Sequence, residues 1–141
     1  MKTFSTLLEK LLFTPSRNRK KSALKEYIAN TPDPDRGYAL AAITGDFKVK
    51  NITASFYHEL IKDQVDYELF KMSYDYIGDL AETISLIWPI KSVKIQEELS
   101  LHAFINLINE NSKSEQKKII LDLMNKSNAN ERWSIIKLTT G

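Results

Sequence analysis

Hydrophobic side chains recur at helical spacing along almost the whole chain, and this pattern restricts the fold more than any other feature. At the N-terminus they occupy every third or fourth position: Phe4, Leu7, Leu8, Leu11 and Leu12. Only four glycines and four prolines interrupt 141 residues, and no alternating strand pattern with hairpin turns is present. The sequence therefore predicts an all-α fold of eight or nine short helices in a single compact domain, residues 1–141.

Capping residues and helix breakers indicate where these helices begin and end. Ser16 is expected to cap a helix that runs to about Ala29, with Leu24, Tyr27 and Ile28 on its buried side. Further helix starts are expected at Asp33-Pro34, Asn51, Asp66, Asp79, Ser114 and either Asn128 or Asn130, and stops at Gly45, Gly78 and Pro89. Another amphipathic helix is expected from Leu101 to Ile108.

Two segments depart from the simple amphipathic pattern. Residues 67–77 are apolar on most sides, which predicts a buried central helix. Residues 90–100 are ambiguous and are consistent with a loop that contains one helical turn.

The net charge of +2 hides a strong asymmetry along the chain. Residues 1–31 contain seven basic and two acidic side chains, a net charge of +5, which leaves −3 for the remainder. A basic end on a nearly neutral protein indicates an anionic partner that is met by one surface.

Four of these basic residues would lie in the first two turns of the helix capped by Ser16: Arg17, Arg19, Lys20 and Lys21. The helix macrodipole disfavours cations at an N-terminus. A phosphate group docked at that end would remove the conflict, because free backbone N–H groups and cationic side chains would converge on it. The alternative is a solvated basic surface with a slightly unfavourable helix end, and both interpretations remain open at this stage.

Other candidate sites have simpler structural explanations. Asp79 and Glu82 could hold a metal ion together with Asp75, but their spacing after Gly78 favours a capping box. His58 and His102 have no neighbouring ligand at metal-binding spacing, so each is expected to be a surface or half-buried histidine. Most aromatic residues lie at core spacing, although Tyr38 or Tyr74 could stack on a base.

Several functional classes are excluded or disfavoured by composition. The chain has no cysteine, which excludes disulfides, thiolate metal sites and cysteine nucleophiles. It has neither a phosphate-binding glycine loop nor a nucleophile elbow. It also has no apolar run long enough to span a membrane and no signal-peptide pattern at its start, so a cytoplasmic location is expected.

Several longer motifs, in the same order, resemble the N-terminal domain of bacterial ATP-dependent DNA ligases. The matching stretches are Phe4–Leu8, Phe13–Asn18, Thr31–Leu40, Ser73–Thr83 and Arg132–Gly141. The resemblance covers residues 1–89 and 112–141. It implies an all-helical DNA-binding domain that grips duplex DNA over the minor groove on both sides of a nick, and a bacterial, nucleoid-associated location.

In such ligases the following nucleotidyltransferase domain is adenylated on the lysine of a Lys-x-Asp-Gly motif, which this chain lacks. The resemblance therefore implies a non-catalytic piece of a longer ligase active in DNA repair, replication or recombination. Its catalytic partners would be the nucleotidyltransferase and OB-fold domains of the same parent chain, and ATP and Mg²⁺ would serve those domains. No cofactor or metal is expected in this piece.

The resemblance also implies which residues contact DNA. Lys21 joins this set on helical geometry, because it shares a helix face with Arg17 and Lys20. The full set is Thr14, Ser16, Arg17, Asn18, Lys20, Lys21, Arg36, Gly78, Asp79, Lys137, Thr139, Thr140 and Gly141. A helical protein-interaction module with no DNA role is the competing interpretation, and a free-standing enzyme is the third.

Overall fold

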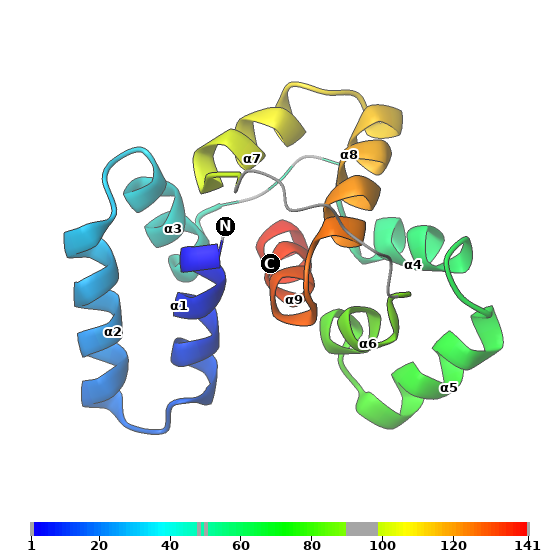
Figure 1. The fold of residues 1–141 in the computed structure, drawn as a ribbon, viewed down its shortest axis with the longest axis horizontal. Helices are drawn as coiled ribbons and strands as arrows, with labels where there is room; N and C mark the ends of the chain where they lie inside the picture. The colour runs from blue at the N-terminus through cyan, green and yellow to red at the C-terminus, as the bar shows by residue number, and fades with distance from the viewer. Residues whose placement is uncertain (1, 48, 50, 90–98, 141) are drawn as a thin grey trace.

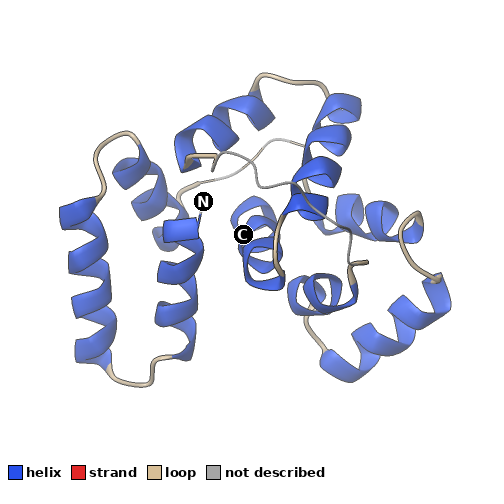
Figure 2. Cartoon of the chain, viewed as in Figure 1, coloured by secondary structure: helices blue, strands red, loops and turns tan. Residues whose placement is uncertain are grey.

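Every regular element that the structure describes is an α-helix, and loops connect the helices (Figures 1 and 2). The computed structural model describes residues 2–47, 49, 51–89 and 99–140. Across these residues the helices are α1 Lys2–Phe13, α2 Arg17–Asn30, α3 Asp35–Thr44, α4 Ala54–Lys62, α5 Tyr67–Ile77, α6 Leu80–Ile87, α7 Leu101–Asn109, α8 Lys113–Lys126 and α9 Ala129–Thr140. The prediction of an all-α fold with eight or nine helices is confirmed.

Helix α9 lies in the middle of the molecule, and the other helices are arranged around it (Figure 1). The pair α1 and α2 forms one end of the longest axis, and α4 and α5 form the other. α9 packs against α6 on one side and α1 on another. It therefore connects the two ends of the molecule, and five of its side chains are buried: Ser134, Ile135, Ile136, Leu138 and Thr139.

The hydrophobic core receives at least one buried side chain from each of these helices. Representative members, from α1 to α9, are Phe4, Tyr27, Ala39, Tyr57, Phe70, Ile84, Phe104, Ile120 and Ile135. The hydroxyl groups of Tyr57 and Thr139, both buried in this core, lie 2.6 Å apart and form a hydrogen bond between α4 and α9. Burial raises the pKa of Tyr57 well above its usual range.

Side-chain caps begin several helices where the sequence predicts them. The caps accept backbone N–H groups as follows: Ser16 from Arg19 at 3.4 Å, Asp66 from Glu68 at 2.8 Å, Asp79 from Glu82 at 2.8 Å and Asn128 from Glu131 at 2.9 Å. Gly45 and Gly78 end α3 and α5 in the left-handed conformation, with φ of 82° and 79°. These starts and stops are confirmed, because each is set by chemistry within a few residues.

Three helix starts differ from the prediction. α3 begins at Asp35, one residue later than the expected first position at Pro34. α4 begins at Ala54 and not directly after Asn51, which adopts a left-handed φ of 69° in the preceding turn. α8 begins at Lys113, so Ser114 lies inside its first turn instead of capping it. Each of these loops contains more than one residue that can begin a helix, so the sequence alone does not select the start.

The prediction that residues 67–77 form a buried central helix is wrong. α5 lies at the periphery, where it packs on α6 and α4, and Phe70 is its buried residue. On its outer side Leu69, Met72 and Tyr76 are 53%, 70% and 92% exposed. The apolar pattern describes the helix alone and contains no information about how many neighbours cover it. The apolar stripe predicted for the N-terminal helix is likewise not buried along its whole length, because Leu12 at its end is 57% exposed.

The ambiguous segment 90–100 falls outside the described residues except for its end, where Ser100 caps α7 by accepting the N–H of Ala103 at 3.3 Å.

Of the helices in the described part of the chain, none combines the length and the apolar character required to cross a bilayer.

Paired substitutions within α5 test its position at the periphery. We expect Phe70→Ala to lower the free energy of unfolding by about 3–5 kcal/mol, because it empties a buried site. Met72→Ala, two residues away on the exposed side, should change it by about 0.5 kcal/mol or less. Urea denaturation followed by circular dichroism measures both. Equal and large losses would show that α5 is covered on both sides.

Candidate nucleic-acid interface

The loop between α1 and α2 presents the start of α2 to solvent. The N–H of Thr14 donates to the carbonyl of Lys10 at 3.1 Å and so completes the last turn of α1. Ser16 caps α2 with its side chain, and its carbonyl accepts the first helical hydrogen bond, from the N–H of Lys20 at 3.0 Å. The backbone N–H groups of Arg17 and Asn18 belong to the first turn, where no carbonyl of the helix lies in position to accept them. They therefore point out of the end of the helix.

The side chains around these amides are cationic, and most of them are exposed. Arg17, Arg19 and Lys21 are exposed, and Lys20 is half-buried. The first turn of α2 contains no acidic residue. Within the described part of the chain, none of these four side chains forms an ion pair. We call residues Thr14–Lys21 the cationic tip.

Arg19 belongs to the cationic tip in the structure, although the resemblance does not include it among the contact residues. Its N–H is occupied by the Ser16 cap, and its side chain is exposed, although it points to the other side of α2 from Arg17 and Lys21. The uninterrupted basic run Arg19-Lys20-Lys21 is the sequence signal that identifies it.

A second group of predicted residues meets where α6 begins against α9. Gly78 ends α5, Asp79 caps α6, and the ammonium of Lys137 on α9 lies 2.9 Å from Asp79 Oδ2. Partial burial acts to raise the pKa of Asp79, but the N–H of Glu82 and the Lys137 ammonium outweigh it and hold that pKa below its ordinary value. The capping interpretation of Asp79 is therefore confirmed, and the charge of Lys137 is matched within the protein.

The end of α9 divides the predicted contact residues into buried and exposed ones. Thr139 is buried and donates to the carbonyl of Ile135 at 2.8 Å, besides its bond to Tyr57. This placement assigns it a structural role and leaves no surface through which its side chain could reach DNA. Thr140 is exposed and donates to the carbonyl of Ile136 at 2.7 Å. Gly141 lies outside the described residues.

Arg36 and the two tyrosines considered for base stacking are held by internal contacts. Arg36 is half-buried, and its Nε donates to the carbonyl of Thr31 at 2.9 Å, which fixes the turn before α3. The Tyr38 ring packs edge-on against Phe47 at 6.2 Å. Tyr74 packs against Phe70 and His58 at 5.8 and 5.9 Å. The helices that carry these three side chains, α3 and α5, lie away from the loop between α1 and α2 (Figure 1).

α9 connects the cationic tip to the Asp79–Lys137 pair. The rings of Phe13, beside the tip, and Trp133 on α9 are 6.5 Å apart. On the same side, Asn130 Nδ2 donates to Glu9 at 3.1 Å. Trp133 and Lys137 are four residues apart and so lie one turn apart on neighbouring parts of the helix surface. The two predicted groups are thus separate, and one helix holds both.

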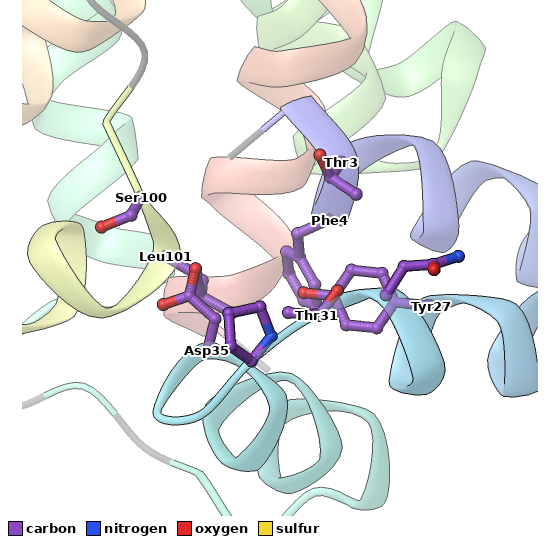
Figure 3. Close-up of a pocket in the computed structure, with 9 residues that line it drawn as sticks. Thr3, Phe4, Tyr27, Thr31, Asp35, Ser100 and Leu101 are labelled. Atoms are coloured by element: carbon purple, nitrogen blue, oxygen red, sulfur yellow. The ribbon is translucent and has the colours of Figure 1, made fainter.

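A cavity of about 310 Å³ opens where four helix ends meet, and Asp35 and Ser100 are among the residues that line it (Figure 3). His102 lies close to both of them. Asp35 Oδ1 accepts the backbone N–H of His102 at 2.9 Å and contacts His102 Nδ1. Ser100 Oγ lies 3.3 Å from that same Nδ1. A catalytic triad requires serine and aspartate on opposite ring nitrogens. This cluster therefore joins α3 to α7 and has no arrangement for nucleophilic catalysis.

No protein-family model, curated protein or solved structure has significant similarity to this chain.

Replacing Asp79 with Asn tests the charge interaction at the start of α6. Asn caps helices about as well as Asp, so the change removes mainly the attraction to Lys137. The folded-state pKa of Asp79 is lowered from 3.8, so its stabilising contribution is present above about pH 4 and is lost as pH falls through the folded pKa.

We therefore expect the wild-type protein to be more stable than Asp79→Asn at about pH 7. The difference should be about 1 kcal/mol or less, because the pair is partly exposed and screened. It should shrink as pH falls through the lowered folded-state pKa of Asp79 and vanish once this carboxyl is protonated in both the folded and the unfolded protein. Urea denaturation over this pH range measures it, and a difference that does not change with pH would contradict the assignment.

Proposed function

We propose that this chain binds duplex DNA without sequence selectivity, and that the cationic tip makes the principal contacts. The observation that carries the proposal is the start of α2, where four cationic residues occupy the first two turns behind two outward-facing amides, with no acidic residue in the first turn. In the free protein this arrangement opposes the helix macrodipole. A phosphate group at the same place satisfies the amides and the cations together.

A polymer of phosphates fits this surface better than a single small anion does. The helix rises about 1.5 Å per residue, so cations spread over residues 17–21 span about 6 Å and can meet more than one phosphate of a strand. Contacts of this kind fix the position of the protein on a duplex and carry no base information. Sequence-independent binding is the expected result.

The pair Asp79–Lys137 contributes a weaker, second contact in this proposal. Lys137 is half-exposed, but its charge is already matched by Asp79 at 2.9 Å. Exposed Thr140 lies in the same last turn of α9. Arg36 and Thr139 are not part of the proposed contact surface, because Arg36 Nε holds the turn before α3 and Thr139 is buried.

The resemblance to ligase DNA-binding domains extends the proposal to a biological role. We propose that the chain grips nicked DNA for sealing by nucleotidyltransferase and OB-fold domains of a parent ligase, in repair or replication. ATP and Mg²⁺ would be used by those domains. The charge arrangement of the cationic tip supports the DNA-binding part of this proposal, and the motifs along the sequence support the ligase part.

The variant Arg17→Ala/Lys20→Ala tests the cationic tip. We expect it to bind duplex DNA about five- to thirtyfold more weakly, from about 0.5–1 kcal/mol for each exposed ion pair lost. The loss should be the same for duplexes of different sequence. The slope of log K against log salt should fall by about 0.9 for each phosphate contact removed. Fluorescence anisotropy over a salt series measures both quantities.

A matched control is Lys113→Ala/Lys118→Ala, which removes two exposed lysines from α8, across the molecule from the tip (Figure 1). It should bind DNA as wild type does. If the wild-type protein fails to bind duplex DNA even at low salt, the proposal is wrong and a protein-interaction module without a DNA role is favoured.

The second contact is tested by Asp79→Asn, which frees the Lys137 ammonium from its carboxylate. We expect DNA binding to become about two- to fivefold tighter at low salt, the equivalent of one weak exposed ion pair. The salt slope should rise by up to about 0.9. The matched control is Asp122→Asn, which frees Lys126 on α8 from a pair at 2.7 Å. An unchanged slope in Asp79→Asn would remove Lys137 from the interface.

A further inference from the structure

The exposed side of α5 forms an apolar stripe. Leu69, Met72 and Tyr76 lie three and four residues apart, so they share one side of the helix, and all three are exposed. Their opposite neighbour on the helix, Phe70, is buried. Isolated exposed apolar residues are ordinary on a protein surface, but a continuous stripe of three large ones marks an interaction surface.

Acidic residues border one side of this stripe. Residues 54–88, which form α4 to α6, contain seven carboxylates and two lysines, a net charge of −5. Asp63 and Asp79 pair with Lys117 of α8 and Lys137 of α9, so this end carries −3 once those two lysines are counted. Glu68 and Asp75 border the stripe directly, because they lie four residues before and three residues after Met72 and so next to it on the helix surface. Asp75 forms no ion pair with a described residue, and the Glu68 contact to Lys71 is long, at 3.9 Å. We call Glu68, Leu69, Met72, Asp75 and Tyr76 the α5 face.

The opposite end of the molecule has the complementary composition. Leu12 and Phe13, at the end of α1, are 57% and 71% exposed. They are followed at once by the cationic tip, and residues 1–31 carry a net charge of +5. Each end of the molecule therefore presents exposed apolar side chains, bordered by negative charge on α5 and by positive charge at the tip.

We infer that the α5 face binds the cationic tip of a second copy of this chain. The two surfaces lie at opposite ends of the longest axis (Figure 1), so they meet between molecules and not within one. Apolar contact between Leu12 and Phe13 of one copy and the stripe of the other removes hydrophobic surface from water. Opposite charges around both surfaces favour this pairing over any pairing of like ends.

This contact is head-to-tail, so each copy can bind two others. Heterologous contacts generate rings or open chains, whereas two identical surfaces would stop at a dimer. Because a helix and a loop cover a small area, the association is weak. It is also sensitive to salt, because the charges involved are exposed. The contact does not depend on the proposed DNA binding, although both use the cationic tip.

Sedimentation velocity of the whole chain in the absence of DNA tests the contact. We expect the weight-average sedimentation coefficient to rise with concentration at low salt and to fall back to the monomer value at high salt. The face variant, Met72→Lys/Asp75→Lys, and the tip variant, Leu12→Ser/Arg17→Ala/Lys21→Ala, should each remain monomeric alone. All five positions are exposed, so both variants should fold.

An equimolar mixture of the two variants gives the decisive result. The intact tip of the face variant can bind the intact α5 face of the tip variant, so the mixture should form a dimer and no larger species. The control Lys113→Ala/Lys118→Ala should associate as wild type does. The inference is overturned if the wild-type chain is monomeric at every concentration at low salt, if either variant alone still associates, or if the mixture stays monomeric.

Discussion

The burial of α9 is the constraint on which the rest of the structure depends. Its Thr139 hydroxyl meets Tyr57 in the core at 2.6 Å, and its Arg132 donates two hydrogen bonds to the carbonyl of Ser85 at the end of α6. A partly buried guanidinium requires such acceptors, because an unpaired buried charge is costly. From this helix Trp133 contacts the end of α1 and Lys137 contacts the start of α6. Both groups of predicted DNA contacts are therefore fixed by one buried helix.

Electrostatics and packing act in opposite directions at α2. The cationic start of the helix is unfavourable for its macrodipole, and Tyr27 is its buried residue. The helix is held mainly by that contact with the core and by partial burial of Leu24 and Ile28. A protein that needed only a stable helix here would place acidic residues in the first turn. The observed sequence accepts a local cost that an external phosphate, or an acidic protein surface, would relieve.

The sequence predicts local features of this fold well and the surroundings of each helix poorly. Caps such as Ser16 and Asp79 depend on atoms within four residues, so they are visible in the sequence. The outward position of α5 and the burial of Thr139 depend on helices far along the chain, which periodicity does not report. For the candidate site, the run of basic residues at the start of α2 is visible in the sequence. The ion pair of Lys137 with Asp79 is not, because it joins residues that are far apart along the chain.

The separation of charge along the long axis connects the two proposed interactions. One cationic tip can contact either a duplex or the α5 face of another copy, but not both, so the two partners compete for it. Duplex DNA carries one negative charge for about every 1.7 Å of its axis, a higher density than the carboxylates around α5 provide. If both proposals hold, DNA displaces the protein contact wherever duplex is present. Self-association would then be confined to molecules that are not bound to DNA.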